Sequence, residues 1–148
     1  MTIDTGWLDL PASVSDDEVR LDKGVAVTRI TSRYESPRQV RAIHDSPGRT
    51  LTIEFRYFGG QEATRHVRFS GIVVGEVGKH SHRIYSLVFN PVSAEAGFQT
   101  MIERAVCDLQ SAIESARFEV SEDNSQATNN VISRVVKPEL PKAAMAAG

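Results

Sequence analysis

Two histidines two residues apart are the closest approach in this sequence to a metal-binding pattern. His80 and His82 flank Ser81, and on a strand such a pair would point to one face, about 7 Å apart. A metal site needs a third and usually a fourth ligand. The candidates on other strands follow no diagnostic spacing: His66, Glu54, His44 and Asp45. We therefore predict no metal site and no cofactor, and interpret the pair as surface histidines beside Lys79 at the start of a strand.

The sequence contains no recognisable catalytic motif. His44-Asp45 could form part of a triad, but the G-x-S-x-G turn that would carry a nucleophile is absent. Asp45 is more simply a residue that opens a turn. The glycine clusters at 59–60 and 75–78 do not match a phosphate-binding loop followed by a helix, and we predict that both are turns. Whether the chain is an enzyme stays undecided, and the absence of a motif favours a non-catalytic role.

Charge is distributed unevenly along the chain. Residues 1–22 carry six acids against one base, and residues 93–148 carry eight acids against five bases. Residues 23–92 carry eleven bases against five acids, and nine of these bases are arginines. Arginine suits carboxylates, phosphates and aromatic rings, so the middle segment could bind an anionic partner. The alternative is that the arginines line the solvent face of a sheet and pair with the acidic flanks.

A β-rich segment positions these basic residues. From Val25 to Phe89, β-branched and aromatic residues are interrupted by turn residues at short intervals, which predicts an antiparallel meander of four or five strands. We expect the strand over 50–57 to form a hairpin with the strand that contains Val67 and Phe69, because the apolar residues of both must share a face. Strands are further predicted at about 24–34, 38–44 and 80–89, the last central or beneath a helix because both its faces are apolar.

This register places several polar residues on one sheet face. Thr52, Glu54 and Arg56 would lie on the same face as His66 and Arg68. If the face binds a partner, five residues are the candidate binding residues: Arg56, His66, Arg68, His82 and Arg83.

A single long amphipathic helix is predicted after the sheet. Asn90-Pro91 ends the last strand, and apolar residues recur at three- and four-residue intervals over about 94–116, forming one stripe that would pack on the sheet. Cys107 lies within this pattern and is interpreted as a small core residue. Residues 118–148 are expected to form a flexible tail, in which 131–136 could add a strand to a sheet edge. The acidic arm 1–22 could dock through Trp7, Leu8, Leu10 and Val14.

These patterns predict an α+β fold in three parts: the acidic arm 1–22, a single α+β domain over 23–117 and the tail. No segment is apolar enough to span a bilayer and no secretory leader is recognisable, so we expect a cytoplasmic protein without a membrane partner. The leading hypothesis is a non-catalytic protein-interaction or assembly module that uses the arginine-rich face or a strand edge, possibly to self-associate. The alternative is nucleic-acid or other polyanion binding, with the acidic flanks as competitors.

Overall fold

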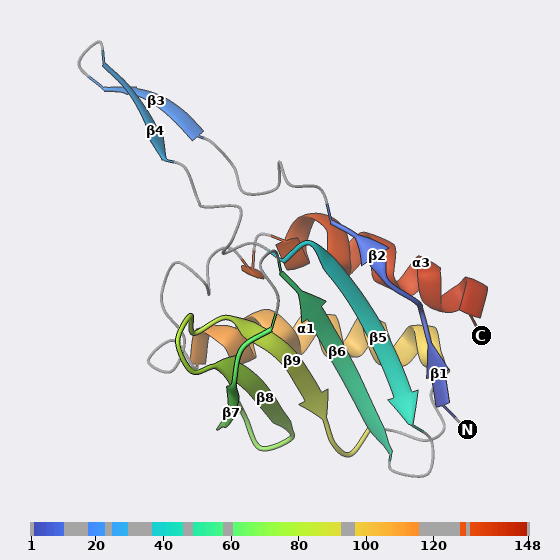
Figure 1. Cartoon of the computed structure of the whole chain (residues 1–148). Helices are drawn as coiled ribbons and strands as arrows, with labels where there is room; N and C mark the ends of the chain where they lie inside the picture. Colours follow the sequence, from blue (N-terminus) through green and yellow to red (C-terminus); the bar gives the residue numbers. More distant parts are fainter. Residues whose placement is uncertain are drawn as a thin grey trace.

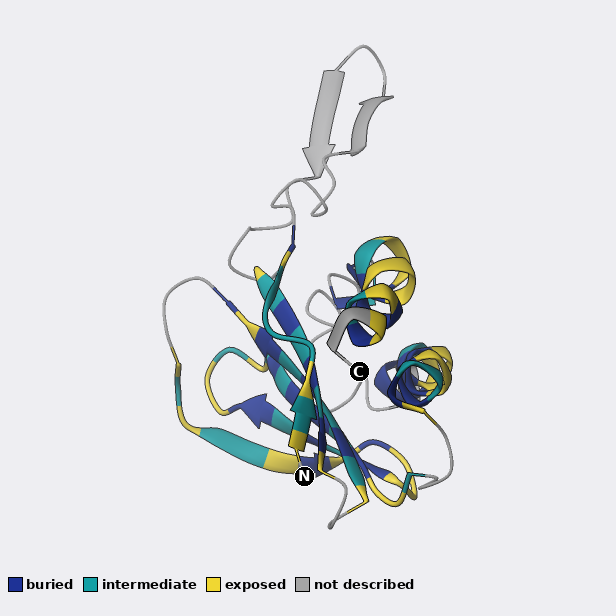
Figure 2. Cartoon of the chain, turned by 90° about the vertical axis from the view of Figure 1, so that its right-hand side faces the viewer, coloured by how far each residue is buried: buried dark blue, intermediate teal, exposed yellow. Residues whose placement is uncertain are grey.

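The computed structural model describes residues 2–10, 18–22, 25–29, 37–45, 49–57, 61–92, 97–115, 128–129 and 131–147, with residues 18–22, 25–29, 114–115 and 146–147 described only by their backbone. One antiparallel sheet forms the body of the protein, and two helices lie on one side of it (Figures 1 and 2). The sheet consists of β1 (Thr2–Asp4), β2 (Leu8–Asp9), β5 (Gln39–Asp45), β6 (Thr50–Arg56), β7 (Thr64–Arg68), β8 (Val73–Gly78) and β9 (Ile84–Phe89). The general α+β class predicted from the sequence is confirmed.

The strand order is not that of a meander. It runs β1-β5-β6-β9-β8-β7, with β2 pairing the other end of β5. β5 and β6 pair as consecutive strands of the predicted meander would, but the predicted hairpin between β6 and β7 is wrong, because β9 and β8 lie between them. β9 is apolar on both faces and takes the central position, as predicted. The outward-facing residues of β6 and β7 nevertheless lie on the same face of the sheet. The pairing through the two intervening strands keeps the alternation of the two faces in step.

The strand boundaries differ from the prediction at β8 and β9. Residues 70–72 form the turn between β7 and β8, closed by a hydrogen bond from the Phe69 amide to the Val73 carbonyl (2.9 Å). The predicted turn at 75–78 lies instead within β8, and residues 79–83 form the turn that leads into β9. The glycine at 75 has a packing role, because a Cβ there would overlap the ring of Phe69.

A second, two-stranded sheet is formed by β3 (Glu18–Asp22) and β4 (Val25–Arg29). The prediction of a first meander strand over 24–34 is corrected here, because β4 pairs with β3 and not with β5.

Two helical segments, not one long helix, cover the inner face of the sheet. α1 (Phe98–Ser115) is shorter than the predicted 94–116. It is followed by η2, a stretch of π-helix over Ile132–Val136, and by α3 (Lys137–Ala147). The stripe predicted on α1 is buried, and Figure 2 shows the buried residues facing the sheet. Cys107 lies outside it and is exposed, so its interpretation as a core residue is wrong.

The predicted arm and tail both contribute to the core. β1 and β2 pair with β5, and Leu10 is buried. In the predicted tail, residues 131–147 are helical. The suggestion that 131–136 adds a strand to a sheet edge is therefore wrong. Apolar side chains of this helical segment enter the same core as the sheet: Val131, Ile132, Val136, Leu140 and Ala144. Residues 118–127 lie outside the described part. None of the described helices is long and apolar enough to cross a membrane.

Candidate interaction surface on the outer sheet face

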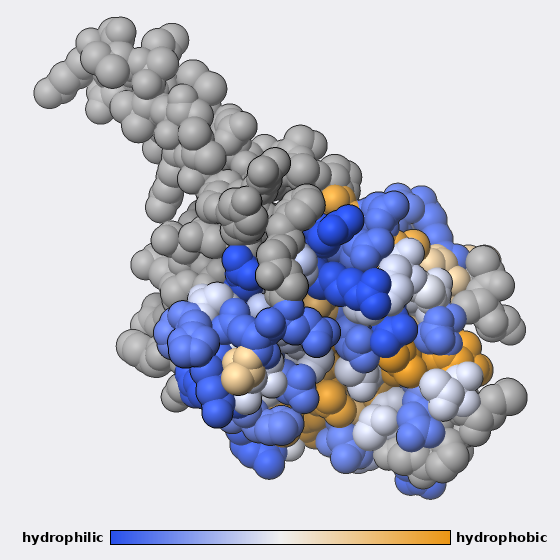
Figure 3. Space-filling model, viewed as in Figure 1, coloured by the Kyte–Doolittle hydropathy of each residue, from blue (hydrophilic) through white to orange (hydrophobic). Residues whose placement is uncertain are grey.

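The face of the sheet turned away from the helices carries an apolar row. The register aligns Ile43, Thr52, Val88 and Val74 across four neighbouring strands. All four are half-buried although none of the described helices covers this side. The row ends at Asp4 on β1 and at Arg68 on β7. Seen from this side, hydrophobic surface lies among hydrophilic residues (Figure 3).

The next row along the strands is ionic. The Arg41 guanidinium lies 3.0 Å from the Glu54 carboxylate on the neighbouring strand. At the other side of the sheet, the His66 imidazole lies 3.5 Å from the Glu76 carboxylate. Ser86 on β9 lies between the two pairs. Acidic residues of the sheet itself therefore lie among the arginines of this face. The sequence had suggested that the acidic partners would come from the flanking segments.

Trp7 extends over this face from the segment between β1 and β2. The Cζ atoms of Arg41 and Arg56 lie 4.5 Å and 3.8 Å from its ring centroid, within the range of cation–π attraction. The preceding Gly6 has a φ of 69°, a conformation that favours glycine, and its amide donates to the Asp4 carboxylate (2.8 Å). This turn places the tryptophan on the two arginines.

Three adjacent hollows on the outer face share lining residues, and we call them together the outer trough. The central hollow, about 350 Å³, contains Trp7, Arg41 and Glu54. It shares Phe55, Arg56, Gln61 and Tyr85 with a hollow of about 410 Å³, and it shares Glu76 and Val88 with one of about 420 Å³ near β7. The trough therefore crosses the sheet from β5 to β7.

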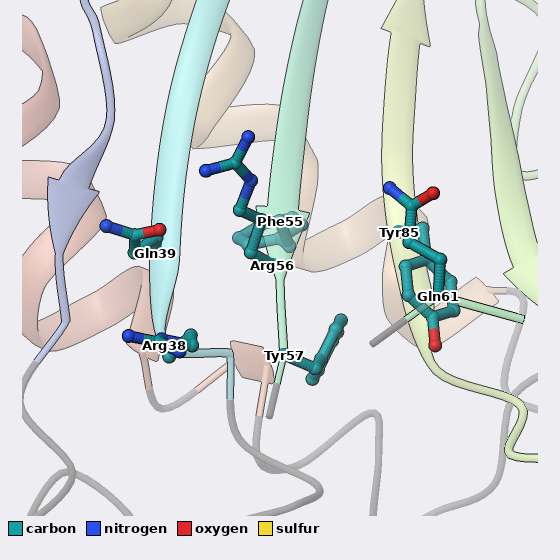
Figure 4. Close-up of a pocket in the computed structure, with 7 residues that line it drawn as sticks. All are labelled: Arg38, Gln39, Phe55, Arg56, Tyr57, Gln61 and Tyr85. Carbon is teal, nitrogen blue, oxygen red and sulfur yellow. The ribbon is translucent and has the colours of Figure 1, made fainter. Parts of the chain in front are cut away.

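Figure 4 shows the hollow at the β5 end of the trough. Arg38, Gln39 and Arg56 lie on one side, Gln61 and Tyr85 lie on the other, and Tyr57 lies between them. The described residues that line this hollow include two arginines and no acid. This end of the outer trough is therefore its most basic part.

A carboxylate beside this hollow fixes the turn before β9. Oε1 of Glu62 accepts hydrogen bonds from the amides of His80 (2.9 Å) and Ser81 (3.0 Å), and the Tyr85 hydroxyl donates to Oε2 (3.0 Å). Partial burial acts to raise the pKa of Glu62, but the hydrogen bonds from Ser81, His80 and Tyr85 outweigh it and lower the pKa from 4.5 to about 2. Glu62 is therefore ionised at neutral pH and orients Tyr85.

Tyr57 closes the bottom of the hollow. Its hydroxyl donates to the carbonyl of Ile84 (2.6 Å), and burial raises the pKa of the phenol, so it stays neutral. The Arg83 guanidinium lies 5.3 Å from the ring centroid of Tyr57, and the ring of Tyr85 meets that of Tyr57 edge-on with centroids 5.3 Å apart. This cluster connects the trough to the core.

The structure divides the five predicted binding residues. Arg56, His66 and Arg68 share the outer face and line the trough, although Arg56 lies near β5 and the other two lie at β7. His82 and Arg83 belong to the turn before β9, and His82 has a φ of 59°. The expectation that His80 and His82 lie on one face of a strand is therefore wrong.

No family model, curated protein or solved structure matches this chain. Among the described residues, no three histidine, cysteine, aspartate or glutamate side chains come together as metal ligands would.

Sequence reasoning missed the residues that shape the trough around the arginines. Trp7 was recognised only as a residue that could dock, because pairing of β1 and β2 with β5 is a long-range event with no local signal. Gln61 and Glu62 follow a glycine pair in a predicted loop, and the partners of Glu62 come from residues 80, 81 and 85. A tryptophan in an acidic arm was the one usable signal.

Proposed function

We propose that this chain is a non-catalytic protein-interaction or assembly module that binds a polypeptide in the outer trough. The observation that carries the proposal is the composition of the trough. An apolar row, a tryptophan and charges of both signs line adjacent hollows on a sheet face that the described helices leave uncovered. Aromatic and arginine residues beside apolar surface are enriched at protein interfaces. We propose a cytoplasmic location for this module, as the lone cysteine suggests.

The mixed charge of the trough favours a polypeptide over a phosphate backbone. Glu54 and Glu76 lie in its middle, where they would repel phosphates. Arg41 is already paired with Glu54, and both Arg41 and Arg56 stack on Trp7. A polypeptide can offer side chains complementary to both signs, whereas nucleic acid offers one sign along its whole backbone.

Nucleic-acid binding remains the alternative proposal because of one specific observation. Among the described lining residues, four arginines (Arg38, Arg41, Arg56 and Arg68) stand against two glutamates. A polyanion neutralised by these arginines would be released steeply by salt. A salt series with labelled nucleic acid therefore separates the two proposals.

Site-specific photocrosslinking in cells tests the main proposal. A photoreactive amino acid at Val88, in the apolar row, is expected to yield a defined adduct with a protein. The same amino acid at Glu103, exposed on α1 on the opposite side of the sheet, is the matched control and should yield no such adduct. Arg56→Glu in the Val88 background should remove the adduct, because it reverses a charge in the trough.

Two results would contradict the proposal. Adducts of the same kind from Val88 and from Glu103 would show that the trough has no special role. An absence of adducts from Val88 in cells that produce the folded protein would show that nothing occupies the trough there.

A further inference from the structure

The guanidinium of Arg56 lies against an aromatic ring at the basic end of the outer trough. Arg56 is the last residue of β6, which lies between β5 and β9 in the sheet (Figure 1). Its Cζ atom lies 3.8 Å from the centroid of the Trp7 ring. Glu54, two residues earlier on the same strand, is paired with Arg41 at 3.0 Å. Among the residues that the structure describes, no acid forms an ion pair with Arg56.

Stacking on a ring orients the Arg56 guanidinium without using its hydrogen-bond donors. The N–H groups of a guanidinium lie in its plane, whereas a ring contacts its face. Arg41 differs, because its Nε and one terminal nitrogen already donate to Glu54. Arg56 is exposed, so an acceptor on another molecule can reach its in-plane donors. Trp7 thus restricts the Arg56 side chain in a position that suits an incoming anion.

The hollow at the β5 end supplies further donors. Arg38 and Gln39 line one side of this hollow of about 410 Å³, and Gln61 lies on the other side (Figure 4). Two acids lie beside the hollow and are engaged within the chain. Glu62 accepts hydrogen bonds from two backbone amides and a tyrosine hydroxyl, and Asp9 accepts one from the Gln39 amide (2.8 Å). The lining itself is therefore suited to an anionic group.

A carboxylate fits this arrangement better than a chain of phosphates does. Its two oxygens match the forked donors of a guanidinium, and it brings a single negative charge. The adjoining central hollow contains Glu54 and Glu76, which would repel a row of phosphates. Along β6, the step from Thr52 in the apolar row to Arg56 spans four residues, about 13 Å. An extended polypeptide covers this distance with an apolar residue at one end and an acidic group at the other.

We propose that the β5 end of the outer trough is a carboxylate-binding subsite in which Arg56 receives an acidic group of the bound polypeptide. This inference rests on the proposed function and names the chemistry of the polypeptide. The partner places an apolar side chain on the apolar row and a carboxylate, about four residues away, at Arg56. Acidic side chains and a C-terminus both supply a carboxylate, and the test below separates these two sources.

Calorimetric titration of the full-length protein with an acetylated and amidated hexaglutamate tests the subsite. Wild-type protein is expected to bind this peptide and to show a saturable change in the emission of Trp7, the one tryptophan of the chain. Arg56→Gln should weaken binding by about fivefold or more, because it removes the charge and the forked donors. Arg104→Gln, at an exposed arginine on α1, is the matched control and should leave the affinity unchanged.

Hexaserine with a free C-terminus separates the two sources of the carboxylate. Binding of this peptide that amidation abolishes would assign the subsite to a C-terminus, whereas binding of the capped hexaglutamate assigns it to acidic side chains. Either result supports a carboxylate-binding subsite, provided that Arg56→Gln weakens it.

Three results would overturn the inference. The first is that neither carboxylate peptide binds. The second is that Arg56→Gln binds as tightly as the wild type. The third is that an oligonucleotide of equal charge binds more tightly than hexaglutamate, which would favour phosphate instead. A Val88 adduct with a protein, together with the first or the second result, would refute the subsite and leave the proposed function standing.

Discussion

At the scale of single residues, a carboxylate and a glycine organise the wall of the outer trough. Glu62 holds the turn at 79–83 through two backbone amides, and it accepts a hydrogen bond from Tyr85. Gly78 lies beside it, because a Cβ at this position would meet the Glu62 carboxylate. The turn, the carboxylate and the tyrosine therefore form one unit.

Replacing Glu62 by glutamine should destabilise the protein in a pH-dependent manner. The folded-state pKa is about 2 against a reference value of 4.5, so the carboxylate stabilises the fold above pH 4.5. This contribution is lost as the pH falls from 4.5 through 2. We expect Glu62→Gln to cost about 1 kcal/mol at pH 7, a value below that of fully buried charged hydrogen bonds because solvent screens the site.

Urea unfolding at pH 7 and near pH 2 measures this difference. Glu103→Gln, at an exposed site on α1, is the control and should change stability little at either pH. An equal loss for Glu62→Gln at both ends of the range would contradict the role of the ionised carboxylate.

A second residue-scale prediction concerns Gly75. A methyl group there would overlap the ring of Phe69, whereas at Gly71 nothing lies within 4 Å of the corresponding position. Gly75→Ala should therefore lower the free energy of unfolding by about 1–3 kcal/mol through overpacking, and Gly71→Ala should be close to neutral. Thermal unfolding of the two variants gives the comparison, and equal melting temperatures would refute the close contact.

At the scale of elements, the buried face of each strand was easier to predict from the sequence than the strands that pair with one another. The alternation in β6 indicated its core face, and the two apolar sides of β9 indicated a central strand. Which strand pairs with β6 depends on contacts between residues far apart in sequence. The predicted hairpin with β7 joined strands that are consecutive in the sequence, whereas in the fold β9 takes the place beside β6. The residues of the outer face were nevertheless predicted correctly. Side chains alternate between the two faces of a strand whichever strand pairs with it.

The C-terminal helix was missed although its spacing was visible. Ile132, Val136, Leu140 and Ala144 recur every four residues, as on one face of a helix. The polar composition of the preceding segment suggested a flexible tail instead. The prolines at 138 and 141 also disfavour a helix by propensity. Packing on α1 stabilises a helix that propensity alone disfavours.

Truncating Leu140 tests this correction. Leu140 is 0% exposed, so Leu140→Ala should cost about 2–5 kcal/mol through lost burial and a cavity. Met145→Ala, at a residue that is 64% exposed on the same helix, should cost less than about 0.5 kcal/mol. Chemical denaturation of both variants measures the difference. Changes near zero in the free energy of unfolding for both variants would instead support the flexible tail that was predicted from the sequence.

At the scale of the whole molecule, the basic middle of the chain folds into a surface of mixed charge. The arginines of β5, β6 and β7 alternate with Glu54 and Glu76 in three dimensions. Sequence composition could not show this, because it counts charges along segments and not across strands. The candidate face was predictable from periodicity, whereas the trough depends on Trp7 and on the strand order.

The mixed charge predicts weak and nonspecific contact with nucleic acid. Fluorescence anisotropy with a labelled mixed-sequence oligonucleotide should show little binding at physiological salt, and Arg56→Glu with Arg68→Glu should change it little. Tight binding by wild-type protein that falls steeply with salt, and is lost in this double variant, would instead establish the polyanion alternative.

The central claim is that the outer trough binds a polypeptide, and the chemical nature of the Val88 photoadduct tests it most directly. Treatment of the crosslinked material with nuclease and with protease, beside the Glu103 control, distinguishes the possible occupants. The account predicts an adduct specific to Val88 that protease removes and nuclease leaves unchanged, with a mass of either two copies of this chain or this chain and one other protein. An adduct that nuclease removes, or one that forms equally from Glu103, would contradict it.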